Sequence, residues 1–178
     1  MTELISVVDE HDNLLKGEDR KVVHSSTLWH RGVHVFVFNS QGELLVQLRS
    51  PIKDKYPDTY DCSTSGHVDF GDSYEETAKR EIEEELGIKD AEIKPSIHFR
   101  MRYGPEDYMI CKMFECIYDG KVRPNEEITE IKFFGMDEIK RLINETPELF
   151  TPWFVEMLKW YFGVENKLEI ISVLTSGR

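Results

Sequence analysis

The stretch from Ser73 to Gly87 constrains the fold most strongly, because it contains a complete set of helix signals. Ser73 followed by Glu76 matches a capping box, in which the two residues satisfy each other's backbone groups at a helix start. Gly87 is a favourable residue for a helix end. Between them apolar residues recur at every fourth position, at Tyr74, Ala78, Ile82 and Leu86. The segment 73–87 is therefore predicted to be an amphipathic helix that buries one stripe against a core.

The segments around this helix predict strands on both sides of it and helices near the end. Alternating or short apolar runs predict strands at 5–8, 14–15, 30–38, 43–48, 60–64, 93–103, 108–117 and 128–134. Helical spacing predicts helices at 136–145 and 151–162, with the aromatic residues of the second as core. This order indicates the α+β class. We expect one domain over 1–178, with an N-terminal β-hairpin (1–24), a catalytic core (28–135) and C-terminal helices (136–162).

Charge and cysteine content limit the class of partner. A formal net charge of -12 opposes binding of nucleic acid through a general basic surface. Cys62, Cys111 and Cys116 lack paired metal-ligand spacing, and an odd number without a secretory signal favours reduced thiols in a cytoplasm. No stretch is long and apolar enough to span a membrane. We expect a cytoplasmic protein that acts on a small molecule, with a homodimer left open.

The predicted helix also carries acidic residues that suggest chemistry. At about 100° per residue, Glu81, Glu84 and Glu85 fall within a sector of about 100°, whereas Glu83 points the opposite way. Like charges in this arrangement repel one another, and a divalent cation would relieve the repulsion. Oxygen ligands suit Mg²⁺ or Mn²⁺. An acidic face exposed to solvent is the alternative, and these residues alone favour it.

The residues before and within this helix resemble the Nudix box. That pattern is Gly, five residues, Glu, seven residues, then Arg-Glu-apolar-any-Glu-Glu-any-Gly-apolar, and it matches Gly66 to Ile88 at every fixed position but one. The exception is Asp72, which stands where the family has Glu. The resemblance implies the Nudix fold, a mixed β-sheet sandwiched between α-helices. It also implies Mg²⁺- or Mn²⁺-dependent hydrolysis of a diphosphate linkage in a nucleoside di- or triphosphate or a nucleoside diphosphate derivative.

The same resemblance implies roles for single residues. Glu81, Glu84 and Glu85 match the metal-binding glutamates, one of which also helps to deprotonate water. Arg80 matches the arginine that orients the first glutamate, and Gly66 matches the glycine whose carbonyl completes the metal shell. Asp72 is one methylene shorter than Glu, so we expect metal binding to survive while full catalytic efficiency is less secure.

Residues 28–50 resemble the Nudix branch of type I isopentenyl diphosphate isomerase, which provides an alternative function. The isomerase has a cysteine where this chain has Ser65, and its metal is held by histidines and glutamates. His30 and His67 match two ligands, and His24 could be a third although its spacing is off by one. The later glutamate pair has at best a partial match at 106–109. Because the isomerase usually breaks the glutamate pattern that is intact here, we favour hydrolysis and interpret His30 and His67 as packed or surface residues. A non-catalytic nucleotide-binding module is a third interpretation.

Residues outside the box are expected to select the substrate. The predicted phosphate-binding cations are Arg49, Lys53 and Arg102, with Lys55 and Arg100 as further candidates. Tyrosines that could stack on a base are Tyr56, Tyr60 and Tyr103. Glu127 is our choice for a distal base or second-metal ligand among the downstream acids. A surface charge or a core position is the alternative for each.

Overall fold

The computed structural model describes residues 4–175, and its sheet is built around one long central strand. β3 (Trp29–Phe38) pairs in parallel with β8 (Asp107–Ile117) and antiparallel with β1 (Leu4–Val8), β4 (Leu44–Arg49) and β6 (Thr64–His67). The outer strands are β2 (Leu14–Asp19), β5 (Tyr60–Asp61), β7 (Lys94–Gly104), β9 (Ile128–Phe134) and β10 (Glu169–Val173). The result is a single mixed sheet.

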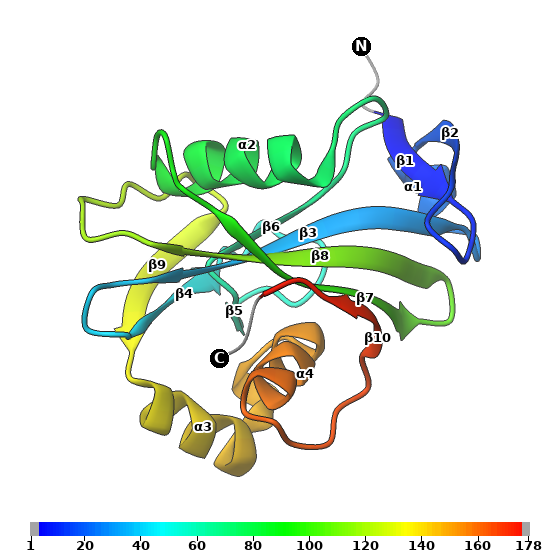
Figure 1. Ribbon diagram of the computed structural model, residues 1–178. Coiled ribbons are helices and arrows are strands. Elements are labelled where there is room, and N and C mark those ends of the chain that lie inside the picture. The colour runs from blue at the N-terminus through cyan, green and yellow to red at the C-terminus, as the bar shows by residue number, and fades with distance from the viewer. Residues whose placement is uncertain (1–3, 176–178) are drawn as a thin grey trace.

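Helices cover both faces of this sheet. α2 (Tyr74–Leu86) lies over one face, and α3 (Met136–Glu145) and α4 (Pro152–Tyr161) lie under the other, as Figure 1 shows. The alternation of β3 explains the two cores: Val33, Val35 and Val37 pack with the α2 stripe, whereas Phe36 and Phe38 pack with α4. The predicted α+β class, with a mixed sheet between helices, is confirmed.

α2 forms as its sequence predicts. The Ser73 hydroxyl accepts a hydrogen bond from the Glu76 amide at 3.2 Å, and the Glu76 carboxylate accepts one from the Ser73 amide at 2.9 Å. Gly87 ends the helix with a positive φ of 65°, a backbone conformation that glycine adopts without strain. All four stripe residues are buried. The capping box and the stripe together fix which face of α2 turns toward the sheet.

Four local features differ from the sequence predictions. The N-terminal hairpin forms, but β2 continues to Asp19 and is followed by α1 (Arg20–Val23), which was not predicted; residues 1–3 of the expected 1–24 unit lie outside the described residues. The strand predicted at 60–64 is instead two strands, so Gly66 and His67 lie on β6. The 3₁₀ turn Pro147–Leu149 and the final strand β10 were also missed. β10 shows no apolar alternation, because its residues are mostly exposed at the edge of the sheet.

No helix within residues 4–175 is long and apolar enough to cross a membrane.

Two neighbouring residues of α2 test the orientation of the helix. Ile82 is fully buried, so Ile82→Ala should lower the free energy of unfolding by about 2–5 kcal/mol through lost packing. Glu83 has an exposed side chain, and Glu83→Ala should change that free energy by no more than about 0.5 kcal/mol. Urea denaturation followed by circular dichroism measures both values. Equal effects of the two substitutions would contradict the assigned buried face.

Candidate active site

The close approach of α2 to β6 brings two glutamates into a sheltered position. The side chain of Glu81 is 12% exposed and that of Glu85 is 6% exposed, whereas Glu84 is 57% exposed. A Cβ atom at Gly66 would collide with the Glu81 carboxylate, so a side chain there would displace that carboxylate from its present position. Glu83 faces solvent and lies 3.7 Å from Lys89. The exposed-face interpretation therefore holds for Glu83 and Glu84 but not for Glu81 and Glu85, although Glu84 also lines the cavity.

Arg80 connects the acidic groups at this end of the helix. Its Nη1 lies 3.1 Å from Glu81 Oε1 and 3.2 Å from Glu84 Oε2, and its Nη2 lies 3.2 Å from Asp69 Oδ2. These contacts orient Glu81, which is the role that the sequence predicts for Arg80. The acid beside Arg80 is Asp69. Within residues 4–175 the Asp72 carboxylate makes no hydrogen bond or ion pair, so its shortened side chain is not part of this network.

Glu85 is fixed by neutral donors from the sheet. Its Oε2 accepts a hydrogen bond from the Thr64 hydroxyl at 2.6 Å and from the Gln47 amide at 3.3 Å. Burial raises the pKa of Glu85, although Thr64 and Lys53 act to lower it. Burial and the nearby Glu85 raise the pKa of Glu81 to about 8. Ionising both carboxylates at once is unfavourable unless a cation lies beside them. Because both groups offer only oxygen ligands, they fit a hard divalent cation such as Mg²⁺ or Mn²⁺.

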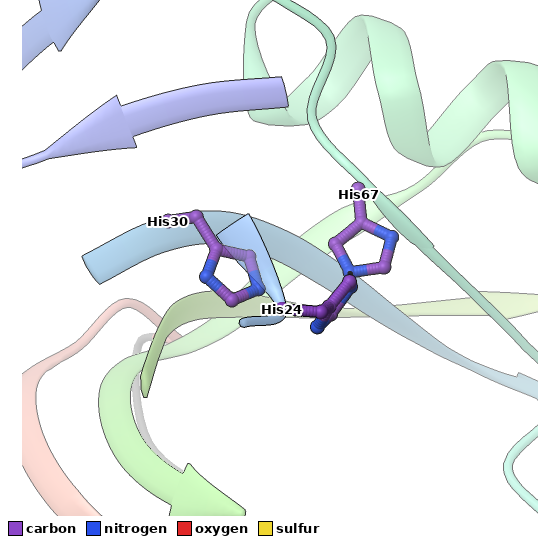
Figure 2. A group of neighbouring side chains, drawn as sticks. All are labelled: His24, His30 and His67. Atoms are coloured by element: carbon purple, nitrogen blue, oxygen red, sulfur yellow. Dashed lines mark hydrogen bonds between the residues drawn. The ribbon is translucent and has the colours of Figure 1, made fainter. Parts of the chain in front are cut away.

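Three histidines form a second cluster of potential metal ligands, shown in Figure 2. His24 follows α1, His30 lies on β3 and His67 lies on β6, and one ring nitrogen of each lies within 4.8 Å of the others. The Nε2 atoms of His24 and His67 are 3.1 Å apart. Asp107 completes the group, with its Oδ1 3.6 Å from His24 Nδ1 and 3.7 Å from His30 Nε2. The interpretation of His30 and His67 as separate packed residues did not anticipate this convergence.

The chemistry of this histidine cluster fits a transition-metal ion. His24 Nδ1, His30 Nε2 and Asp107 Oδ1 are buried and have no hydrogen-bond partner. Burial lowers the pKa of His30 to about 4 and that of His67 well below its ordinary value, so both rings are neutral at pH 7 and keep a lone pair. Imidazole nitrogens suit ions such as Zn²⁺, Ni²⁺ or Fe²⁺ better than Mg²⁺. The unpartnered atoms are those that a bound ion would satisfy.

The glutamates line one cavity of about 530 Å³ together with His24, His67 and Asp107 of the histidine cluster, whereas His30 is buried behind them. Its other lining residues include Arg20, Lys21, Lys53, Lys55, Ser65, Tyr103, Glu127 and Trp153. The cavity therefore combines two sets of metal ligands, several cations and two aromatic side chains. Such a combination can hold the negative charge of a diphosphate beside metal ions.

Among the predicted phosphate-binding residues, Lys53 and Lys55 lie in the cavity lining and the three arginines do not. Arg49 forms an ion pair with buried Asp61 at 3.0 Å. Arg102 packs over the rings of Trp29 and Tyr108. Arg100 pairs with Glu169 at 2.6 Å.

The three tyrosines and the predicted distal base differ in whether they line the cavity. Tyr103 lines the cavity, Tyr60 packs against the core, and Tyr56 contacts the ring of Trp153. Glu127 lines the cavity and contacts Lys53.

The sequence analysis did not single out several residues that line the cavity. Arg20 and Lys21 lie on the unpredicted α1, and Asp107 begins β8 within a segment judged only a partial match. Trp153 was assigned to the core by its helical spacing, yet it also lines the cavity. A local signal existed only for α1, where Asp19 is a good N-cap residue and its carboxylate accepts a hydrogen bond from the Lys21 amide.

The family assignment follows from a match over most of the chain. Residues 28–154 match the family model described as NUDIX domain. The chain belongs to the Nudix family. The Nudix box at 66–88 accordingly coincides with β6, α2 and the Glu81–Glu85 arrangement described above.

Known Nudix proteins similar to this chain include both hydrolases and isomerases by name. An uncharacterized Nudix hydrolase of Pseudomonas aeruginosa is 39% identical over 74% of this chain and 78% of its own length. An isopentenyl-diphosphate Delta-isomerase of Serratia proteamaculans is 32% identical over 89% of this chain and 91% of its own length. A crystal structure from Deinococcus radiodurans, at 24% identity, shares the fold with a TM-score of 0.77 over 89% of this chain and 98% of that one. The resemblance to the isomerase branch is thus confirmed.

The raised pKa of Glu81 predicts a pH-dependent stability in the metal-free protein. The pKa is about 8 in the folded state against an ordinary 4.5, so between these values the folded protein keeps a proton that the unfolded chain loses. Stability therefore falls as pH rises from 4.5 to 8. Glu81→Gln lacks this loss and should gain stability relative to wild type across that window. Urea unfolding with a chelator, at pH 4.5 and 8, measures the gain.

Glu83→Gln controls for the removal of one acidic group, because its side chain is exposed. A stability difference between Glu81→Gln and wild type that does not change with pH would contradict the assigned shift.

Proposed function

We propose that this protein hydrolyses a diphosphate linkage in a nucleoside di- or triphosphate or a nucleoside diphosphate derivative, with Mg²⁺ or Mn²⁺ as cofactor. The observation that carries the proposal is the sheltered pair Glu81 and Glu85, which faces the cavity beside Arg80. Membership of the Nudix family and the intact glutamate pattern support it.

In this proposal the residues of α2 and β6 hold the cofactor. Glu81, Glu84, Glu85 and the Gly66 carbonyl oxygen would be its ligands. A bound divalent ion supplies an acidified water and neutralises charge on a phosphoryl oxygen. Arg80 keeps Glu81 and Glu84 in place, and Thr64 and Gln47 keep Glu85 in place.

The proton and charge transfers can be assigned to residues of the chain. Glu81 is the candidate acceptor of the attacking water's proton, because it lines the cavity beside Arg80 and would be ionised once a divalent ion is bound. The water oxygen bonds to phosphorus as the anhydride P–O bond breaks, and the departing phosphate carries the negative charge. Lys53 is placed to offset that charge from the cavity wall. Glu127 is retained as the candidate distal base or second-metal ligand, since it lines the same cavity.

Glu85→Gln tests the metal-binding role directly. We expect loss of activity of about a hundredfold or more with the fold intact, because the change removes a ligand charge but keeps the shape of the side chain. Glu83→Gln, on the exposed face of the same helix, should keep wild-type activity. A fully active Glu85→Gln enzyme would refute the proposal.

The substrate class is tested by a screen. Nucleoside di- and triphosphates, nucleotide sugars and dinucleotides are incubated with Mg²⁺ or Mn²⁺, and the products are identified by chromatography. We expect release of a mononucleotide or phosphate that stops when a chelator is added. Calorimetric nucleotide binding with no turnover of any compound would instead support a non-catalytic binding module.

A second candidate function is isomerisation of isopentenyl diphosphate. The convergence of His24, His30 and His67 favours it, together with similarity to the Serratia proteamaculans isomerase. Ser65 argues against it, because a hydroxyl is a poor substitute for the thiol expected at that position. We therefore predict that isopentenyl diphosphate with Mg²⁺ yields no dimethylallyl product while a control isomerase is active. If the dimethylallyl product forms, isomerisation becomes the assigned function in place of hydrolysis.

We also propose that the protein acts in the cytoplasm on a small molecule and does not bind nucleic acid. The free cysteines and the net charge of -12 support this proposal. A homodimer is a further hypothesis, which size-exclusion chromatography with light scattering can test.

A further inference from the structure

One loop carries two lysines, and each contacts a carboxylate in or beside one of the two sets of metal ligands. The loop lies between β4 and β5, and it contains Lys53 and Lys55. Lys53 Nζ contacts the Glu127 carboxylate and lies 3.9 Å from Glu85 Oε1. Lys55 Nζ lies 2.7 Å from Oδ2 of Asp107, the carboxylate that belongs to the histidine cluster. Both ammonium groups thus contact carboxylates that a metal ion would use.

The backbone of this loop is held in place by contacts that do not involve the lysine side chains. The Arg49 guanidinium donates hydrogen bonds to the carbonyl oxygens of Lys55 at 2.9 Å and Tyr56 at 3.1 Å, while it pairs with Asp61. Tyr56 and Asp58 have positive φ values of 50° and 56°, which are uncommon outside glycine and persist only where surrounding contacts impose them. The loop backbone is therefore anchored to Arg49 at Lys55 and Tyr56, and the side chains of Lys53 and Lys55 attach the loop to the cavity.

An ammonium group and a divalent cation compete for the negative charge of one carboxylate, even where they face different oxygens, as Lys55 does at Oδ2 of Asp107 while the histidines face Oδ1. Glu85 and Glu127 are close enough to Lys53 to be neutralised by it, and Asp107 is neutralised by Lys55 in the same way. A metal ion at either position would repel the lysine beside it. The released ammonium groups would remain over the cavity, where a diphosphate is the natural acceptor.

We propose that the 50–59 loop is a lysine strap whose Lys53 and Lys55 neutralise a carboxylate beside each set of metal ligands in the metal-free protein, and that both are transferred to the substrate diphosphate when metal ions bind. This rests on the proposed function for the position of the first ion. The strap makes the affinity for a diphosphate depend on prior metal binding, because free lysines become available only after displacement. It also lowers the affinity for the metal itself, because each ion must displace an internal cation.

Calorimetric titration with Mg²⁺ alone tests the competition at the glutamates. Lys53→Met should bind Mg²⁺ at least threefold more tightly than wild type, and Lys53→Arg should bind it as wild type does. Lys21→Met is the matched control: Lys21 lines the same cavity, and its side chain forms no ion pair within residues 4–175. It should bind Mg²⁺ within twofold of wild type. Unchanged or weaker binding by a folded Lys53→Met protein would overturn the strap.

The histidine cluster is titrated in the same way with Zn²⁺, which nitrogen ligands favour. Lys55→Met should bind Zn²⁺ at least threefold more tightly, whereas Lys79→Met should match wild type. Lys79 is a suitable control because its side chain is 52% exposed against 51% for Lys55, and it pairs with Glu75 outside the cavity. Equal Zn²⁺ affinity in wild type and Lys55→Met would remove Lys55 from the proposal.

Transfer to the substrate has its own measurement. In saturating Mg²⁺, Lys53→Met should bind methylenediphosphonate, which cannot be hydrolysed, at least threefold more weakly than wild type. Backbone amide hydrogen exchange of the non-proline residues at 52–58 should become faster when Mg²⁺ is added without a diphosphate. Unchanged exchange together with unchanged diphosphonate affinity would refute the transfer. Loss of activity in Glu85→Gln is independent of these results, so failure of the strap leaves the proposed hydrolysis standing.

Discussion

The contact between α2 and β6 at Gly66 is the constraint on which the site depends. The absence of a side chain there lets Glu81 lie against the sheet, and Glu85 is buried one turn later. Neither carboxylate has enough water around it to ionise freely beside the other. The apolar stripe of α2 packs against the sheet, and this packing holds the two carboxylates close together despite their repulsion. Folding therefore creates an electrostatic conflict that a divalent ion would resolve.

β6 joins the two sets of metal ligands because neighbouring strand residues point in opposite directions. Gly66 faces Glu81 on α2, and His67 reaches His24 and His30 on the far side of the strand. The same short strand thus contributes to an oxygen-rich site and to a nitrogen-rich site within one cavity. The family box explains the first site, and the second depends on α1 and β3, which lie outside the box.

The sequence predicted features whose signal is local, and missed those that arise from tertiary packing. The limits of α2 and the direction of Glu83, opposite to Glu81 and Glu85, follow from helix geometry and caps. His24 was doubtful because spacing along the chain says little about a residue carried by a short helix. Arg49 had the right charge for a phosphate, yet buried Asp61 holds it elsewhere. No sequence pattern distinguishes a cation paired inside the protein from one available to a ligand.

The parallel pairing of β3 with β8 has a consequence for synthesis of the chain. Trp29 is aligned with Tyr108, so the central strand lacks one neighbour until the ribosome has released residues far beyond it. Contacts of such high sequence separation form slowly, and an unpaired central strand is prone to associate with other chains. The nascent protein therefore passes through a period in which its central strand has an open edge. Chaperone dependence would be concentrated in that interval, before α4 closes the lower face of the sheet.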